Sequence, residues 1–266
     1  MGGGREAAVR CYGLRALALA VVLSALVVGV SFALGGTAGL AAGCVIVLVC
    51  AWIVYFYSER AVLSALRARP VGEVEMPELY GLVRELCVAA RLPVPRLFLS
   101  PAVQPNVLCV GCTPRSVALC CTEGLLRSLA WPELRAVLAH ELGHVSRRDI
   151  VVSSWSAGFA ALFSLVWLRP LAALVLRWAA PPAREYGADA SGALLTGDPM
   201  ALASALRKID VCAASLPLPP RGALAASSHL TIAHPFPEEG YGRLFLTHPP
   251  VRERVRRLEM LAGYPR

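Results

Sequence analysis

Two histidines four residues apart, with a glutamate directly after the first, are the residues of this chain best suited to chemistry. They form the stretch His140-Glu141-Leu142-Gly143-His144. Positions i and i+4 of an α-helix share a face, so both imidazoles can bind one metal ion while Glu141 acts as a base. Zn²⁺ accepts imidazole nitrogens at about 2.0–2.1 Å, and a catalytic zinc keeps three protein ligands and one water. The alternative is that these polar side chains share a solvated helix face by chance.

The sequence around this motif predicts the helix that holds it. Pro132 and Glu133 suit a first helical turn, and an apolar stripe at helical spacing follows them. The stripe comprises Leu134, Val137, Leu138, Leu142 and Val145. His140 and His144 fall outside the stripe.

A pair of acidic residues downstream offers the missing ligand. Glu185 and Asp189 are one turn apart on a helix that is expected to begin near Pro182. Glu185 can reach the metal, while Asp189 accepts the outer N–H of a ligand imidazole and fixes its tautomer. Glycines 187 and 192 each cost about 1 kcal/mol of helix stability relative to alanine, so we expect close packing against the first helix to offset them. The alternative is an ordinary surface helix with its charges in water.

These residues resemble the HtpX-like membrane zinc metallopeptidases, which are relatives of the CAAX prenyl proteases. Four motifs in the order of that family carry the resemblance. They are Gln104-Pro105-Asn106-Val107-Leu108, the stretch 140–144 followed by Arg148-Asp149, the segment 184–189, and Leu246-Thr247-His248-Pro249-Pro250 followed by Arg254. The chain departs from the family pattern in the Val-Leu-Cys that follows Asn106 and in the short span between His144 and Glu185.

The resemblance implies a site and a reaction. His140, His144 and Glu185 are then the ligands of one zinc ion per chain, and Glu141 is the general base. The implied function is hydrolysis of peptide bonds in membrane or membrane-proximal proteins.

The composition indicates a membrane protein. Of the 266 residues, 56% are hydrophobic and 17% charged, and the mean hydropathy is +0.58. Residues 14–34 and 39–57 are apolar runs, each close to the roughly 20 residues that a bilayer-spanning helix needs, and Gly35-Gly36-Thr37 suits a turn between them. A cleaved signal peptide is the alternative for the first run, but its apolar part exceeds the about 7–15 residues of such peptides.

Charge predicts the orientation of these spans. Basic residues flank both ends of the pair and are absent from the turn; they are Arg5, Arg10, Arg15, Arg60, Arg67 and Arg69. The positive-inside rule then places both ends, and the catalytic motifs, on the cytoplasmic side of the plasma membrane. The net charge of +8 is better explained by attraction to anionic lipid than by nucleic acid.

The nine cysteines predict free thiols. Their number is odd and several lie in apolar runs, which favours buried thiols in a reducing compartment over disulfides. Cys109, Cys112, Cys120 and Cys121 lie close together in the sequence, so a structural zinc knuckle is the weaker alternative.

A small sheet and several helices are expected around the site. Residues 96–99 and 106–111 are strand-like, and 116–121 can pair back on the second strand as a hairpin. Helices are expected at 77–90, with Leu79, Leu82, Val83, Leu86 and Cys87 inward, at 200–211, with Leu202, Leu206 and Ile209 inward, and at 251–261. Residues 215–245 suggest a long irregular loop, in which His229 and His234 are taken as surface residues.

The predicted hairpin has a possible role in substrate binding. Its edge strand can hold any extended peptide across the metal through main-chain hydrogen bonds. Asn106 lies at one end of that strand, where its amide can fix a substrate carbonyl. The alternative for Asn106 is a plain Asx-turn after Pro105.

His248 and Arg254 are candidates for stabilising the transition state. A developing oxyanion needs positive charge or donors beyond the metal, and either residue can supply them. Two alternatives remain for His248: it binds the zinc itself and holds the enzyme inactive, or it only caps or packs a helix.

Residues 150–180 are too short for two full crossings, and one crossing would separate His140 from Glu185. We therefore predict a helical hairpin that dips into the cytoplasmic leaflet or lies on it. The alternative is a pair of buried helices.

The sequence thus predicts a mostly helical fold with a small β-sheet. An N-terminal transmembrane hairpin (1–60) precedes a zincin-like metallopeptidase domain (61–266) with an apolar insertion at 150–180. The expected activity is zinc-dependent endopeptidase action on membrane or unfolded proteins, in quality control or proteolytic processing. The rivals are a non-catalytic membrane protein that keeps the fold for binding or regulation, against which an intact Glu141 argues, and a prenyl-type processing protease, for which the chain is short.

Overall fold

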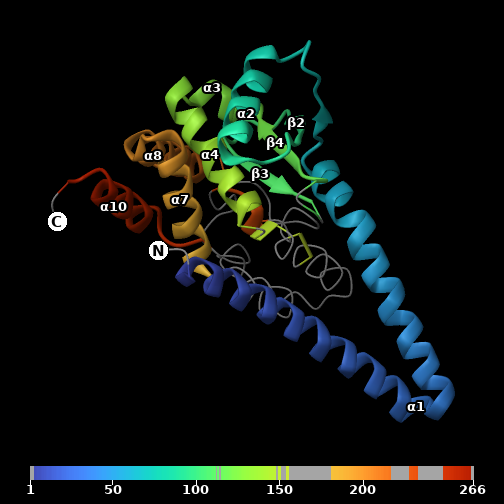
Figure 1. The fold of residues 1–266 in the computed structure, drawn as a ribbon. Helices are drawn as coiled ribbons and strands as arrows, with labels where there is room; N and C mark the ends of the chain where they lie inside the picture. Colours follow the sequence, from blue (N-terminus) through green and yellow to red (C-terminus); the bar gives the residue numbers. More distant parts are fainter. Residues whose placement is uncertain are drawn as a thin grey trace.

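The computed structural model describes residues 3–111, 113, 115–147, 149–150, 154–155, 181–216, 228–232 and 248–264. Helices surround a small mixed sheet, and a long bent helix extends away from them (Figure 1). The predicted fold class is confirmed. Most of the insertion expected at 150–180, most of the loop expected at 215–245, and His234 lie outside the described residues.

Both predicted spans belong to one bent helix, α1 (Gly3–Ala65). The bend is at Gly36, whose φ of 57° and ψ of −137° few residues other than glycine adopt. The two arms touch near the bend. A Cβ added to Gly39 would lie 1.9 Å from the carbonyl oxygen of Ser31, and one added to Gly43 would lie 2.9 Å from the Cβ of Ser31. Glycines at this spacing let two helical arms approach closely, so the bend depends on them.

Most of the apolar part of α1 is exposed within the described part of the chain. Ala20–Phe56 has a mean hydropathy of 2.4 and is long enough to cross a membrane. Leu34 is 85% exposed and Leu48 69%. A continuous exposed apolar surface of this kind is expected where lipid, rather than water, surrounds the helix.

The sheet contains β1 (Arg69–Pro70), β2 (Arg96–Ser100), β3 (Val107–Val110) and β4 (Ala118–Thr122), in the order β1-β2-β4-β3. β2 and β4 are parallel, and the other two pairs are antiparallel. The predicted hairpin is confirmed, because Val107 lies opposite Cys121 and Val110 opposite Ala118. β3 is therefore an edge strand.

The remaining helices agree with the sequence patterns in most places. α2 (Pro77–Ala90) buries the five residues predicted to point inward. α8 (Pro199–Ser215) likewise buries Leu202, Leu206 and Ile209, and α10 spans Val251–Leu261. The short helix α3 (Glu123–Ser128), which Thr122 caps, was not predicted.

The motif helix α4 (Trp131–Ser146) is buried on its polar side as well as along its apolar stripe. His140 is 0% exposed and Glu141 2%, so the solvated-face alternative is wrong. The reason is that α7 (Pro182–Thr196) and α8 pack against α4. Glu133 fixes the start of the helix, since it accepts hydrogen bonds from the Ala130 N–H at 2.8 Å and the Ser204 hydroxyl at 2.7 Å.

α4 and α7 approach closely at glycines, as the sequence predicts. A Cβ added to Gly192 would lie 2.8 Å from the backbone nitrogen of His140, and one added to Gly143 would lie 3.3 Å from the carbonyl oxygen of Ala188. No other side chain fits at Gly192 without a shift of the backbone. This contact brings the polar side chains of the two helices together.

Candidate active site

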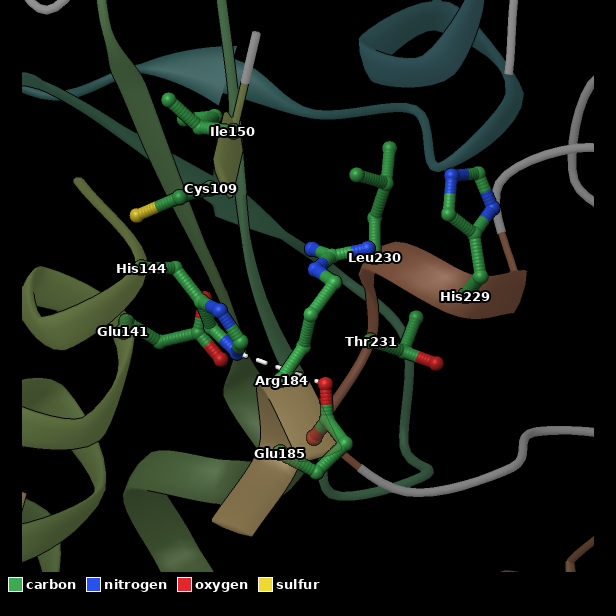
Figure 2. A pocket seen from close by; sticks show the side chains of 9 residues that line it. All are labelled: Cys109, Glu141, His144, Ile150, Arg184, Glu185, His229, Leu230 and Thr231. Atoms are coloured by element: carbon green, nitrogen blue, oxygen red, sulfur yellow. Dashed lines mark ion pairs between the residues drawn. The ribbon is translucent and has the colours of Figure 1, made fainter. Parts of the chain in front are cut away.

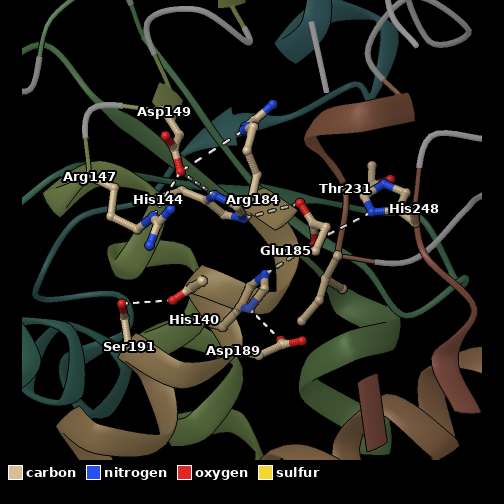
Figure 3. A network of polar contacts seen from close by, with 12 residues as sticks. His140, His144, Arg147, Asp149, Arg184, Glu185, Asp189, Ser191, Thr231 and His248 are labelled. Carbon is tan, nitrogen blue, oxygen red and sulfur yellow. Dashed lines mark hydrogen bonds and ion pairs between the residues drawn. The ribbon is translucent and has the colours of Figure 1, made fainter. Parts of the chain in front are cut away.

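His140 and His144 of α4 face Glu185 of α7 (Figure 3). His140 Nε2 lies 3.7 Å from Glu185 Oε2, and His144 Nε2 lies 3.4 Å from Glu185 Oε1. Tetrahedral ligands with bonds of about 2.0–2.1 Å are about 3.3–3.4 Å apart. The spacing of the three side chains therefore suits one zinc ion.

The state of these atoms also fits a metal. His140 Nε2 and Glu185 Oε2 are buried and have no hydrogen-bond partner among the described residues. Such atoms cost stability unless something binds them. Burial lowers the pKa of His140, against the opposing effect of Asp189, which favours the neutral imidazole that metals bind.

Within the part of the chain that the structure describes, these three residues are the single cluster suited to a metal ion. Cys109, Cys120 and Cys121 are free buried thiols, and Cys112 lies outside the description. The zinc-knuckle alternative therefore has no support among the described residues.

Asp189 and Arg254 form a chain of contacts behind His140. Asp189 Oδ1 lies 2.9 Å from His140 Nδ1, as expected for the acceptor of the outer N–H. Arg254 donates from Nη2 and Nε to the two oxygens of Asp189, at 2.7 and 2.9 Å. Burial alone would raise the pKa of Asp189, but the charge of Arg254 and hydrogen bonds from Arg254 and His140 hold it below its usual value. Arg254, which is 0% exposed, thus contacts Asp189 on the side of that residue away from His140 Nε2.

Asp149 has the corresponding position beside His144. Its Oδ2 lies 3.6 Å from His144 Nδ1 and accepts a hydrogen bond from Arg147 Nε at 3.1 Å. Arg184 Nε lies 4.0 Å from the same oxygen. The sequence alone suggested no role for Asp149, which lies five residues after His144, or for Arg184, which directly precedes Glu185.

Glu141 lines a cavity with His144, Glu185 and Arg184 (Figure 2). Burial, and next the charge of Glu185, raise the pKa of Glu141 well above its usual value, while hydrogen bonds from Cys109 oppose this. A bound dication would oppose it as well. Glu141 thus lies one residue after His140 and lines the same cavity as His144 and Glu185.

His248 contacts Glu185. Its Nδ1 lies 3.4 Å from Glu185 Oε2, and its Nε2 lies 3.0 Å from the carbonyl oxygen of Ser228. Burial would raise the pKa of Glu185, but His144, His248 and Arg254 together hold it well below its usual value. Glu185 is therefore a carboxylate, the form that binds a metal.

Two other residues named in the sequence analysis, Asn106 and His229, are buried within the protein. The side-chain oxygen of Asn106 accepts N–H groups from Val107 at 3.0 Å and from Ile232 at 3.2 Å. His229 is 3% exposed and lines the cavity, so its assignment to the surface is wrong. The cause is the short helix η1 (Ser228–Leu230), which packs beside β3 instead of extending into solvent.

Comparisons with known proteins agree with this geometry. Residues 74–262 match the model of peptidase family M48. A protease HtpX homolog from Kineococcus radiotolerans is 46% identical over 242 residues, which cover 80% of this chain and 82% of that protein. Another, from Arthrobacter sp., is 44% identical over 235 residues, which cover 79% and 81%.

Among solved structures, the crystal structure of S. mikatae Ste24p matches with a TM-score of 0.49 and 16% identity. The match covers 92% of this chain and 65% of that chain. On the evidence of the family match and the close relatives, the chain belongs to peptidase family M48 and is a membrane-anchored metallopeptidase of the HtpX type.

Proposed function

We propose that this protein is a zinc-dependent endopeptidase that cleaves membrane or unfolded proteins in membrane-protein quality control. The observation that carries the proposal is the convergence of His140, His144 and Glu185 beside the buried carboxylate of Glu141. Two imidazoles and a carboxylate are a ligand set of catalytic zinc, one ion per chain.

The chemistry follows from the position of each side chain. Zinc held by His140, His144 and Glu185 would supply a Lewis acid and would lower the pKa of a water to about 7. Glu141 is the base that would take the proton of the attacking water and give it to the leaving amine nitrogen. Asp189 holds His140 with Nε2 directed at the metal position.

We propose His248 as the group that stabilises the oxyanion. The three guanidinium nitrogens of Arg254 all have acceptors, in Asp189 and the carbonyl oxygen of Ile232, which favours a supporting role for that residue. His248→Ala is expected to lower kcat more than it raises KM, because the group acts on the transition state. If His248 were instead an inhibitory fourth ligand, the variant would bind zinc more weakly and cleave faster.

The proposed topology is a two-span anchor at 1–60 and a catalytic domain at 61–266 on the cytoplasmic side of the plasma membrane. Its support is the apolar, bent α1 and the basic residues at both ends. Tyr55, at the end of the apolar part of α1, contacts Trp155, with ring centroids 6.3 Å apart. The insertion at 150–180 thus begins beside the C-terminal end of the apolar part of α1, where the chain would leave the membrane, which supports a shallow hairpin. Labelling of a cysteine at position 169 from the far side of the membrane would contradict it.

The decisive experiment uses the full chain in detergent, with metal analysis and cleavage of unfolded casein. Glu141→Gln keeps the side-chain shape but cannot accept the proton, so we expect full zinc content and no cleavage. The control replaces both histidines by alanine and is expected to lose the metal. Proteolysis by the Gln variant at the wild-type rate, or zinc retained without both histidines, would refute the assignment.

A further inference from the structure

Residues 228–232, which we call the strap, lie along the outer edge of β3. Thr231 forms an antiparallel bridge with Leu108, and the Ile232 N–H donates to the carbonyl oxygen of Val107 at 3.1 Å. The same N–H lies 3.2 Å from Asn106 Oδ1. All five strap residues are buried, with exposed fractions from 0% at Ser228 to 8% at Leu230. The strap therefore occupies the edge at which a peptide would add a strand.

The part of the edge that the strap covers adjoins the catalytic base. The carbonyl of Asn106 accepts the N–H of Thr122, the last residue of β4, so the main-chain groups of Asn106 point toward β4. Because the direction alternates along a strand, those of Val107 and Cys109 point away from β4, toward the outer edge. Ile232 binds Val107, and the antiparallel bridge between Thr231 and Leu108 places Leu230 opposite Cys109, which lines the same cavity as Glu141. The strap thus lies alongside β3 from Val107 to Cys109, up to the cavity that Glu141 lines.

Both ends of the strap are held by side chains that also contact the ligand Glu185. The carbonyl oxygen of Ile232 accepts a hydrogen bond from Arg254 Nη1 at 2.8 Å, and that nitrogen lies 3.6 Å from Glu185 Oε2. The carbonyl oxygen of Ser228 lies 3.0 Å from Nε2 of His248. The strap backbone therefore contacts groups that surround the metal position, and His229, Leu230 and Thr231 line the same cavity as Glu141 (Figure 2).

Three groups together bind the main chain of one residue. Asn106 Oδ1 and the Val107 carbonyl accept its N–H, and Arg254 donates to its carbonyl. These contacts use only main-chain atoms, so any extended peptide can make them. The side chain of Ile232 is 1% exposed and packs in the main hydrophobic core, which makes its position suited to a branched aliphatic side chain.

We propose that the strap occupies the substrate's own binding site, with Ile232 in the place of an aliphatic substrate residue, and that an extended peptide must displace the strap to be cleaved. This inference rests on the proposed peptidase function. In the resting enzyme the strap covers the edge of β3, so folded proteins nearby cannot pair with it. An unfolded chain, which can supply a whole strand, competes for it.

The first test measures amide hydrogen exchange in Glu141→Gln, which binds substrate without cleaving it. The probe is a casein peptide that the wild-type enzyme cleaves, added above its KM. We expect exchange at residues 231–232 to rise when the peptide binds, because the strap leaves the edge. Unchanged or slower exchange there, with the peptide bound, would overturn the proposal. If the wild-type enzyme cleaves no peptide, the proposed function fails instead.

The second test uses Ile232→Pro, which lacks the N–H that the edge binds. We expect a higher kcat/KM for casein with unchanged zinc content, since the strap competes less well. Ile232→Val keeps the N–H and is the matched control, expected to stay near the wild-type rate. A folded, zinc-loaded Pro variant that cleaves more slowly would make the strap a structural strand. If the Pro variant does not fold, the exchange experiment decides.

Discussion

The two imidazoles that we propose to bind the metal differ in how firmly the protein holds them. His140 Nδ1 lies 2.9 Å from Asp189, which Arg254 binds with two hydrogen bonds. His144 Nδ1 lies 3.6 Å from Asp149, beyond a good hydrogen bond. The His140 side chain is 1% exposed and that of His144 11%.

The difference follows from the elements that supply the carboxylates. Asp189 lies on α7, one turn after Glu185, and α7 is fixed against α4 by the contact at Gly192. Asp149 follows the end of α4 and precedes the apolar insertion. One side of the site is thus positioned by helix packing within the core, and the other by the start of a segment that we propose to be membrane-associated. Changes at the membrane are expected to reach the metal through His144.

On the His140 side of the site, the largest loss of stability is expected from a substitution of Arg254. Arg254→Met leaves Asp189 buried without its charge partner, and breaking such a pair costs about 3–5 kcal/mol of unfolding free energy. Arg256→Met on the same helix is the control, because Arg256 is exposed and its loss is expected to change stability by at most about 0.5 kcal/mol. Thermal or denaturant unfolding of the detergent-solubilised proteins measures both.

Equal stability of the Arg254 and Arg256 variants would show that the Asp189 contact is not buried in solution. A loss confined to kcat, with stability unchanged, would return Arg254 to the direct oxyanion role that the sequence also allowed.

Local patterns in the sequence predicted the elements whose neighbours are close along the chain. The bounds of α2 and α10 and the inward face of α2 follow from apolar periodicity and from prolines at helix starts. The metal ligands could be proposed for a similar reason, because His140 with His144, and Glu185 with Asp189, are each one helical turn apart.

Contacts between distant segments were beyond the same reasoning. The burial of α4 on its polar side depends on α7 and α8, and nothing in residues 131–146 encodes those neighbours. The pairing of Thr231 with Leu108 joins segments more than 100 residues apart through a single bridge, so His229 had no signal for burial. Arg254 was found as a candidate, but its pairing with Asp189 requires the tertiary structure.

A milder change on the firm side is Asp189→Ala. Without its acceptor, His140 loses its fixed tautomer and orientation, and zinc affinity is expected to fall about 10–100-fold, as for other residues that support a metal ligand. Competition with a chelator measures the affinity. Asp189→Asn retains one acceptor oxygen and is expected to lose less; identical affinities for all three proteins would reject the role of Asp189.

The smallest effect is expected on the looser side, from Asp149→Ala. At 3.6 Å its carboxylate orients His144 weakly, so zinc affinity should fall by less than about tenfold, the lower limit for supporting residues. The same chelator titration applies, and Arg147→Met, which removes one of the partners of Asp149 but leaves the carboxylate, is the companion variant. A loss of zinc affinity as large as that of Asp189→Ala would mean that Asp149 forms a full hydrogen bond with His144 when zinc is bound. The reason is that a bound cation strengthens the hydrogen bond from the imidazole N–H to its acceptor. The two sides would then be equivalent in the metal-bound enzyme, and the proposed route from the membrane segment to His144 would have to pass through a firm contact instead of a loose one.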